Sequence, residues 1–282
     1  MREHEKEFTV GVMSRILRVS QSGYYRWRRM GPGKRERNRA LLESVIREVH
    51  QESRGRYGSP RVHAYLKRRG YRCGLEHIAD IMRKAGIRGK ARKRYKATTN
   101  SRHSEPASPN LVPQGMRAIG QDLIWLTDVT YIRTDEGWLY LCVFLDLFSR
   151  KVVGWSVSGF NDAELVMSAL WKALKERRPR PGLIVHSDRG GPYASKRFRA
   201  MLQGIGAQQS MSRRGNCYDN AVCESFFHSL KVELDAHQVY DGRTTARSDL
   251  FEFIEAFYNR ERIHSALGFQ SPEQFELTAR SA

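Results

Sequence analysis

The stretch Ile124-Trp125-Leu126-Thr127-Asp128-Val129-Thr130-Tyr131-Ile132 is dense in β-branched and aromatic residues, which indicates a β-strand. It lies within the first of three such segments, residues 122–133, 138–148 and 151–157, which are separated by short turns. Connections this short favour an antiparallel meander of three strands. Within the first strand, Asp128 stands among apolar neighbours, where an ionised carboxylate is costly without a partner or a cation.

Helical and strand patterns alternate beyond the third strand. The predicted elements are a helix over 162–177, capped by Asn161 or Asp162, a strand over 183–187, a helix that Ser195 caps and that ends at about 203, a strand over 207–211 and a helix that carries Glu224. Three antiparallel strands followed by alternating helices and strands match the ribonuclease-H-like fold. We therefore predict an α/β domain with a mixed five-stranded sheet and flanking helices.

The charge of the chain is concentrated in its first part. The net charge of the 282 residues is +19; residues 1–120 contain 29 Lys and Arg against 10 Asp and Glu, whereas residues 121–282 contain 20 of each kind. This excess predicts a polyanion partner, because neutralising phosphates releases counterions and drives binding independently of sequence. A basic surface that is merely solvated is the alternative.

The basic part is predicted to be all-α and to begin with a compact helix-turn-helix over residues 8–29. Val12, Met13, Ile16 and Leu17 have helical spacing. Ser20 is expected to cap the second helix, on which Arg26 is available for phosphates.

A second helix-turn-helix is predicted further along the basic part. A long helix over 37–51 precedes a helix that Ser59 caps, with Pro60 at its first position, and a further helix over 75–85. Helices joined by a short glycine-containing turn in a basic setting fit a DNA-binding unit, and an ordinary helical hairpin is the alternative. The outward residues of the middle helix that we assign to DNA are Arg61 and Arg68.

The composition also predicts the domain boundaries and the compartment. We expect a helical DNA-binding region over 1–95, a basic and polar linker over 96–117, a catalytic core over 118–240 and a C-terminal helical extension over 241–282. The four cysteines, at positions 73, 142, 217 and 223, form no C-x-x-C pair, which favours a reducing compartment without disulfides or structural zinc. No stretch of eighteen apolar residues occurs, so we expect a cytoplasmic protein without a membrane partner.

Three acids are candidates for a common site. Asp188 follows the apolar run of the fourth strand, and Glu224 lies after 35 intervening residues, 189–223, inside a helical pattern. In a ribonuclease-H-like sheet, Asp128 on the first strand lies beside Asp188 at the end of the fourth. Cys223, Phe227, Leu230 and Leu234 form the packed stripe of the last helix, which puts Glu224 at the edge of the buried face.

Carboxylates that converge in this way favour a particular metal chemistry. They are hard oxygen ligands, which suit Mg²⁺ or Mn²⁺ better than zinc. Two such ions about 4 Å apart activate a nucleophile and stabilise the leaving oxygen in phosphodiester displacement. His228 and Lys231 continue the stripe of Glu224, together with Asn220, and point to where a DNA phosphate could lie.

Each acid also has a structural alternative. Asp128 alone could be a strand-end residue, Asp188 a turn residue and Glu224 a surface residue of its helix. Asp146 is a rival ligand because it ends an apolar strand, and Asp122 and Asp219 rank below it; Asp219 is a good helix N-cap. His186 is closer to a supporting or substrate-contacting residue than to a zinc ligand, because no Cys or His partner is suitably spaced.

The chain resembles the OrfB transposases of the bacterial insertion-sequence-three family, which are relatives of the retroviral integrase catalytic core. The resemblance covers nearly the whole chain. The motifs that carry it are Ser22-Gly23-Tyr24-Tyr25-Arg26-Trp27, Tyr57-Gly58-Ser59-Pro60-Arg61-Val62, Trp125 to Tyr131, His186-Ser187-Asp188-Arg189-Gly190, Ser212 to Phe227 followed by Leu230-Lys231, and Tyr258 to Gly268 with Ser271-Pro272.

The resemblance implies a function and a set of site residues. It implies that Asp128, Asp188 and Glu224 are a catalytic metal-binding triad, and that the protein cleaves strands at element ends and joins them through the freed 3′-hydroxyl. It also implies action as a fusion with an upstream OrfA segment, of which this chain resembles the downstream part. One departure, Gly191-Pro192 before Tyr193, predicts a changed loop beside the site and an intact triad.

We therefore expect a DNA transposase that uses two Mg²⁺ or Mn²⁺ ions. It is expected to act on terminal repeats and target DNA as a homo-oligomer, at least a dimer. A ribonuclease-H-like nuclease that cuts without joining, and a DNA-binding protein with a silent catalytic half, are the rival interpretations. Near the site, we assign DNA contacts to Arg213, Arg214, His228 and Lys231, and supporting roles to His186 and Asn220. Tyr258, Asn259, Arg260 and His264 are expected to close the domain or to contact DNA.

Overall fold

The computed structural model describes the chain except for residues 32, 91–107, 113–114, 214–219, 235–238 and 281–282. The chain divides into two compact units, Met1–Gly89 and Lys90–Ala282. Each unit has its own buried hydrophobic residues. No helix in the described part of the chain combines the length and the apolar composition needed to cross a bilayer.

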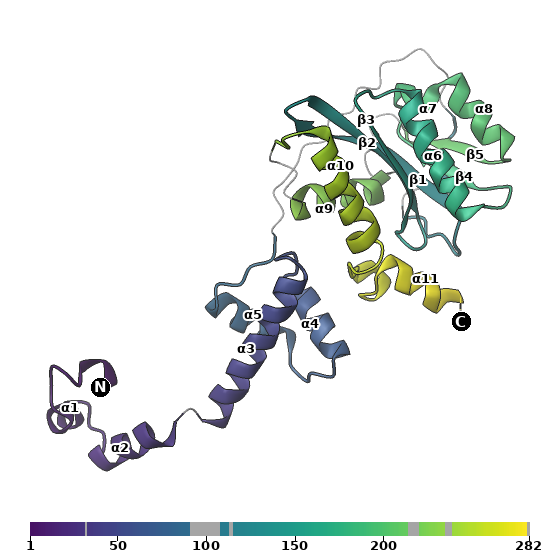
Figure 1. Cartoon of the computed structure of the whole chain (residues 1–282). Helices are drawn as coiled ribbons and strands as arrows, with labels where there is room; N and C mark the ends of the chain where they lie inside the picture. Colours follow the sequence, from purple (N-terminus) through teal and green to yellow (C-terminus); the bar gives the residue numbers. More distant parts are fainter. Residues whose placement is uncertain (32, 91–107, 113–114, 214–219, 235–238, 281–282) are drawn as a thin grey trace. The chain divides into compact units, whose positions relative to one another are not determined.

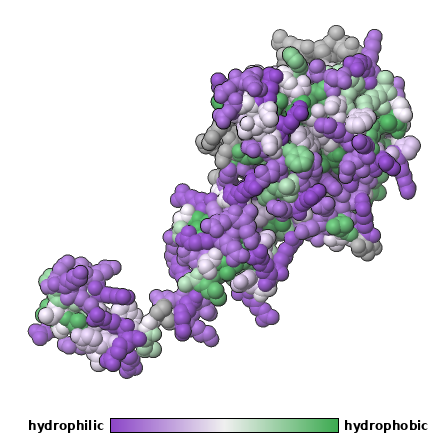
Figure 2. Space-filling model, viewed as in Figure 1, coloured by the Kyte–Doolittle hydropathy of each residue, from purple (hydrophilic) through white to green (hydrophobic). Residues whose placement is uncertain are grey.

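The first unit begins with short helices, η1 (Arg2–His4), α1 (Val10–Ile16) and α2 (Gln21–Met30). The predicted cap of α2 is confirmed, because the Ser20 hydroxyl accepts a hydrogen bond from the Gly23 N–H. The predicted apolar stripe is only partly buried: Met13 is 7% exposed, whereas Ile16 is 73% exposed. This helix pair therefore leaves much of its apolar surface uncovered, and hydrophobic patches interrupt a mainly hydrophilic surface in Figure 2.

Three further helices pack together around their own small core. They are α3 (Lys34–Glu52), α4 (Ser59–Arg68) and α5 (Leu75–Lys84). Ile46, Val62 and Ile78, one from each helix, are fully buried. The predicted Ser59 cap is wrong by one residue, because Gly58 is the N-cap and Ser59 is already helical. Pro60 tolerates this shift, since the first N–H groups of a helix have no intrahelical acceptor.

The second unit is built on the predicted five-stranded sheet (Figure 1). The strands are β1 (Ile124–Thr134), β2 (Gly137–Asp146), β3 (Val152–Ser158), β4 (Ile184–Ser187) and β5 (Gln208–Met211), in the order β3-β2-β1-β4-β5. The first three pair antiparallel, and β4 pairs parallel to both β1 and β5. This mixed topology confirms the ribonuclease-H-like fold and puts β1 in the centre.

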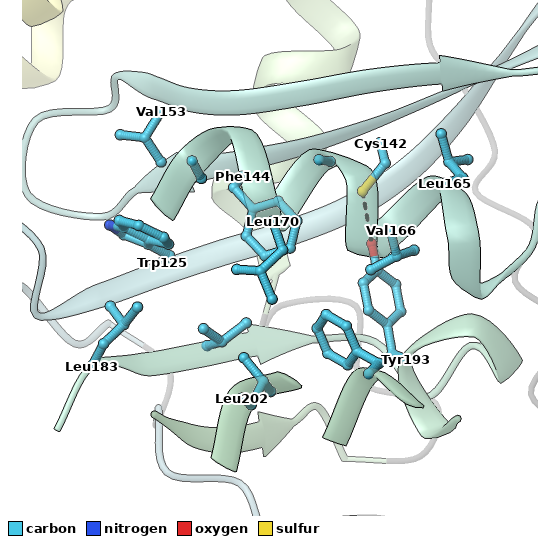
Figure 3. Close-up of a cluster of buried hydrophobic side chains, with 14 of the residues drawn as sticks. Trp125, Cys142, Phe144, Val153, Leu165, Val166, Leu170, Leu183, Tyr193 and Leu202 are labelled. Atoms are coloured by element: carbon cyan, nitrogen blue, oxygen red, sulfur yellow. Dashed lines mark hydrogen bonds between the residues drawn. The ribbon is translucent and has the colours of Figure 1, made fainter. Parts of the chain in front are cut away.

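Helices cover both faces of this sheet. On one face lie α6 (Ala163–Arg177), α7 (Gly191–Ala194) and α8 (Lys196–Gly204), which enclose the main core (Figure 3). The caps of two helices follow the sequence, because Asp162 accepts from the Leu165 N–H and Ser195 from the Phe198 N–H. On the other face lie α9 (Ala221–Glu233) and α10 (Arg243–Phe251), as Figure 1 shows.

The C-terminal residues pack onto the same unit. They form η3 (Glu252–Tyr258), η4 (Ser265–Leu267) and α11 (Pro272–Arg280). The Asn259 side chain accepts from the Val152 N–H and donates to the Val152 carbonyl, so it extends the hydrogen bonding of β3, the edge strand. Arg262 donates two hydrogen bonds to the Glu233 carboxylate on α9. The C-terminal segment is thus bound both to the sheet and to the helix that carries Glu224.

Two smaller expectations concern the linker and the cysteines. Residues 108–112, which the composition assigns to the linker, hydrogen-bond to β5: the Ser108 hydroxyl donates to Gln209, and the Leu111 N–H donates to Ser210. Cys73, Cys142 and Cys223 are free thiols, and Cys217 lies outside the described residues.

Candidate active site

Asp128 lies in the middle of β1, opposite Val143 of β2. One of its carboxylate oxygens accepts a hydrogen bond of 2.7 Å from the Val129 N–H. The pKa of Asp128 is raised to about 8, first by burial and then by the negative charges of Asp188 and Glu224. The charges of Asp188 and Glu224 thus both act on Asp128, although the three acids come from separate parts of the chain.

Asp188 follows the last residue of β4 and is held by its own loop. Its Oδ1 accepts from the Gly190 N–H at 2.9 Å, and the Gly190 carbonyl accepts from the Tyr193 N–H at 3.0 Å. A Cβ on Gly190 would lie 3.0 Å from this Asp188 oxygen, which favours glycine there. Gly191 and Pro192 begin the short helix α7, which was not predicted, so the changed loop is one tight turn of helix.

Glu224 lies in the first turn of α9 and is exposed as a residue. Its pKa is nevertheless raised by partial burial of the carboxyl group. Cys223, Phe227 and Leu230 are buried beside it, as predicted, while Leu234 is only partly buried. An acid in the first turn of a helix is also favoured by the positive end of the helix dipole. Glu224 can therefore reach the surface while its helix is anchored.

The candidate DNA contacts near these acids differ in exposure. Lys231 is partly buried, and its ammonium lies 5.0 Å from the centre of the Tyr131 ring. Burial lowers the pKa of Lys231, and the charge of Asp128 opposes this effect. His228 is partly buried and Arg213 is exposed, whereas Arg214 lies outside the described residues. Lys231 is thus a predicted DNA contact whose pKa is affected by the charge of one of the acids, Asp128.

The two predicted supporting residues lie on different elements. The ring nitrogens of the buried His186 are hydrogen-bonded to the hydroxyls of Ser210, at 2.8 Å, and Ser212, at 3.2 Å, so the ring ties β4 to β5 and the residue after it. Asn220 precedes α9 and donates through Nδ2 to the Thr127 carbonyl at 3.3 Å. The buried Oδ1 of Asn220 has no hydrogen-bond partner among the described residues.

The rival acids have structural roles at the start of β1. Asp146 is fully buried; it accepts from the backbone N–H groups of Asp122 and Ser149 and pairs opposite Trp125. Asp122 accepts from the Trp125 indole and from Arg177. The carboxylate oxygens of Asp146 and Asp122 thus accept hydrogen bonds from residues other than those around Asp128. Asp219, the third rival, lies outside the described residues.

The candidate DNA contacts of the first unit all lie on helices. Arg26 on α2 and Arg68 at the end of α4 are exposed. Arg61 is partly buried, with its guanidinium 5.6 Å from the centre of the Tyr57 ring. Arg26 and Arg68 therefore present the more accessible charges.

Several residues that hold the site together were missed in the sequence. The C-terminal motif was assigned to Tyr258, Asn259, Arg260 and His264, yet Arg262 is the buried arginine and Arg260 is exposed. The polar Thr127, directly after the apolar Ile124-Trp125-Leu126, is a sequence signal for one of them; it is fully buried and hydrogen-bonded to Tyr193.

The donor chemistry of the three acids fits a divalent cation. Among the described residues, no group of three His, Cys, Asp or Glu side chains is gathered closely enough to hold a metal ion as it stands. The raised pKa of Asp128 reflects burial first and then the charges of the other two acids, and a hard divalent cation would offset both effects. The carboxylates therefore suit such an ion chemically and would have to draw together around it.

Comparisons with known proteins agree with this architecture. A family model described as "Integrase core domain" matches residues 120–217, a second of the same description matches 205–272, and one described as "HTH-like domain" matches 36–95. The last match agrees with the predicted second helix-turn-helix region.

Two curated relatives are similar over almost their whole length. "Transposase InsF for insertion sequence IS3A" of Escherichia coli strain K12 is 43% identical over 97% of this chain and 96% of its own. "Insertion element IS600 uncharacterized 31 kDa protein" of Shigella sonnei is 39% identical, over 93% of this chain and 97% of its own. Among solved structures, the HTLV-2 integrase catalytic core domain in complex with magnesium is 17% identical, with a TM-score of 0.45 over 57% of this chain and 99% of its own. The chain belongs to the IS3 family of transposases, enzymes that act on DNA through an integrase-type core.

Proposed function

We propose that this transposase cleaves DNA strands at insertion-sequence ends and joins the freed 3′-hydroxyl to target DNA, with Asp128, Asp188 and Glu224 as the metal-binding triad. The observation that carries the proposal is the parallel register of β1 and β4, in which Asp128 and Asp188 each lie two residues beyond the pair Leu126 and His186. The charges of Asp188 and Glu224 also raise the pKa of Asp128. Structural ion pairs commonly neutralise acids; here the two strongest charge effects on a buried acid come from two more acids, and the positive charge of Lys231 opposes them. That arrangement is suited to a divalent cation.

The chemistry follows from this donor set. Two Mg²⁺ or Mn²⁺ ions held there would activate the attacking oxygen and stabilise the leaving oxygen. Asp128 and Asp188 would hold them from the sheet, and Glu224 would close the site from the exposed edge of α9. Lys231, about two turns further along the same helix, would bind a phosphate oxygen of the strand being cut. The other protein groups thus orient DNA, and no covalent intermediate with the enzyme is needed.

The first unit is proposed to bind the element ends. Its exposed Arg26 and Arg68 belong to the part of the chain that contains the whole excess of positive charge. Contacts of this kind position DNA and make binding strongly dependent on salt. Because two element ends are cut and joined together, we propose action as a dimer or a larger oligomer, fused to an upstream OrfA segment.

A cleavage and joining assay tests the proposal. The protein, alone and fused to an upstream segment, is incubated with Mg²⁺ and a labelled duplex that carries the terminal repeat. We expect 3′-end cleavage and joined products, both abolished by Glu224→Gln. Glu164→Gln is the matched control, because Glu164 is an exposed acid whose ion pair with Arg197 is itself exposed and contributes little.

The other outcomes identify the rival functions. Cleavage without joined products would favour a nuclease that cuts only. A shift in the mobility of the DNA without any Mg²⁺-dependent product, in the fused form as well, would favour a silent DNA-binding protein. Normal activity of Glu224→Gln would remove this residue from the triad.

A further inference from the structure

Thr127 is the residue immediately before Asp128, and it is fully buried. Successive side chains of a strand point to opposite faces. The Thr127 side chain accordingly enters the core on the side of α6, α7 and α8, where it contacts Tyr193 and Cys142. Its polar atoms make contacts with two other segments of the second unit, one through the hydroxyl and one through the carbonyl.

The hydroxyl of Thr127 connects β1 to the Asp188 loop. It is hydrogen-bonded to the Tyr193 hydroxyl, with 3.1 Å between the oxygens. Tyr193 is buried, and Figure 3 shows its hydroxyl directed into the core toward Cys142, whose sulfur lies 3.8 Å away. The turn that links Asp188 to Tyr193 through Gly190 contains two successive hydrogen bonds, so the position of Tyr193 is transmitted to the Asp188 carboxylate.

The carbonyl of Thr127 connects β1 to α9. The parallel ladder between β1 and β4 runs from Ile124 to Leu126 and ends before Thr127. The Thr127 carbonyl instead accepts from the Asn220 side chain at 3.3 Å. Asn220 is buried and lies one helical turn before Glu224. The Asn220 side chain makes no capping hydrogen bond to α9. Its hydrogen bond to the Thr127 carbonyl instead connects the start of α9 to β1.

We propose that Thr127 is a positioning residue that fixes the three acids of the site relative to one another. Its main chain continues directly to Asp128, its hydroxyl holds the Asp188 loop through Tyr193, and its carbonyl holds the helix of Glu224 through Asn220. This inference rests on the proposed function, in which the acids bind divalent ions. Loss of the hydroxyl contact lets the Asp188 loop shift and weakens ion binding, since supporting contacts of metal ligands are commonly worth about 10–100-fold in affinity.

The test measures ion binding without any DNA or turnover. The thermal unfolding of the full chain is followed against Mn²⁺ concentration. The concentration that gives one fixed rise in Tm, the same for every variant, is recorded as the Mn²⁺ midpoint, because the rise depends on the ratio of this concentration to the Kd. Thr127→Val keeps the shape and the carbonyl but removes the hydroxyl, and Tyr193→Phe removes the other half of the same bond. Thr127→Ser retains the hydroxyl. Ser156→Ala is the matched control, because it removes a buried hydroxyl bonded to Ser168 on the same face of the sheet.

We expect Thr127→Val and Tyr193→Phe each to raise the Mn²⁺ midpoint about 10-fold. The double variant should be no worse than either single one, because both remove one bond. Thr127→Ser should stay near the wild-type midpoint, and Ser156→Ala should lower the metal-free Tm while leaving the midpoint unchanged. Asn220→Ala should raise the midpoint further when it is combined with Thr127→Val, because it removes a different contact.

The outcomes distinguish a failure of this inference from a failure of the proposed function on which it rests. If the wild type responds to Mn²⁺ and Glu224→Gln abolishes the response, an unchanged midpoint in Thr127→Val and Tyr193→Phe overturns the role of Thr127 alone. If the wild type shows no Mn²⁺-dependent rise in Tm, the proposed metal site is overturned, and the role of Thr127 with it.

Discussion

Breaking the buried ion pair between Arg262 and Glu233 should destabilise the second unit severely. Arg262 donates from Nε at 2.9 Å and from Nη2 at 2.8 Å to the two oxygens of Glu233, and Nη2 also donates to the Ser229 hydroxyl at 2.9 Å. Both residues are about 95% buried, with exposed fractions of 4% and 5%. Arg262→Met removes both charge-assisted bonds while the Glu233 carboxylate stays in the interior.

The magnitude follows from the cost of a buried charge. Removing one member of a buried pair typically costs about 3–5 kcal/mol of unfolding free energy. For a unit of this size, about 2–4 °C in Tm corresponds to each kcal/mol, so we expect a fall of about 6–20 °C. Urea unfolding followed by tryptophan fluorescence measures the loss of unfolding free energy, because the fully buried Trp125 reports on this unit. Thermal unfolding measures the fall in Tm.

Two comparisons decide whether this reasoning holds. The double variant Arg262→Met/Glu233→Met should recover much of the loss, because it replaces a buried pair by apolar side chains. Arg197→Gln, which breaks an exposed pair with Glu164, should change little. A loss below about 1 kcal/mol in Arg262→Met would mean that the pair behaves like a surface pair and would refute the argument.

Three further predictions concern pH, DNA binding and the edge of the sheet. The pKa of Asp128 in the folded protein is about 8, above its ordinary value, so folding favours the protonated acid and the stability of the metal-free wild type should fall as pH rises from about 4 to 8. Thermal unfolding in EDTA should show a smaller fall for Asp128→Asn, and an equal slope in both proteins would contradict the prediction. Arg68→Gln should weaken DNA binding for all sequences and reduce the salt slope by about 1 in titrations, whereas a loss confined to one sequence would indicate base reading. Asn259→Ala should remove the acceptor of the Val152 N–H and the donor to the Val152 carbonyl, and urea unfolding should show a loss of about 1–3 kcal/mol in the free energy of unfolding. An unchanged urea midpoint would show that water replaces both contacts.

The sheet and several helix caps could be predicted because their signals are local. The content of β-branched and aromatic residues placed β1 to β3. Ser20 and Ser195 stand directly before the helices that they cap, and Asp162 was one of two candidates, with Asn161, for the cap of α6. These features depend on neighbouring residues in the sequence, so no tertiary information was needed. The order of the elements then limited the topology to one familiar fold.

Burial in the first unit could not be predicted in the same way. Helical spacing placed Ile16 and Leu17 on one stripe, but both are exposed, with fractions of 73% and 56%. Periodicity identifies which side chains share a helix face, whereas burial requires another element to cover that face. The short helix α7 was missed for a related reason, since Gly191 and Pro192 resemble a loop in isolation and become helical where Tyr193 is fixed in the core.

The three acids, with His186 and Asn220 as supporting residues, could be proposed from the sequence, whereas Thr127 and Arg262 were missed. Asp128 and Asp188 could be identified because charged residues at the ends or centres of apolar strands are costly. Arg262 offered no comparable signal: Arg260 lies two residues earlier in the same motif, and only the packing of the chain after η3 determines which arginine turns toward Glu233. Contacts between residues far apart in sequence therefore account for most of what was missed.

The most direct test of the central claim is a comparison of joined DNA product among variants of the three acids. Asp128→Asn, Asp188→Asn and Glu224→Gln are assayed singly and in pairs with Mg²⁺ and then Mn²⁺, with Glu164→Gln as the control. If the acids act as one metal-binding unit, each single variant should lose nearly all product and the pairs should lose no more, because residues that act together are not additive. Losses that multiply from one variant to the next, or product retained by any one of the three, would contradict a shared site.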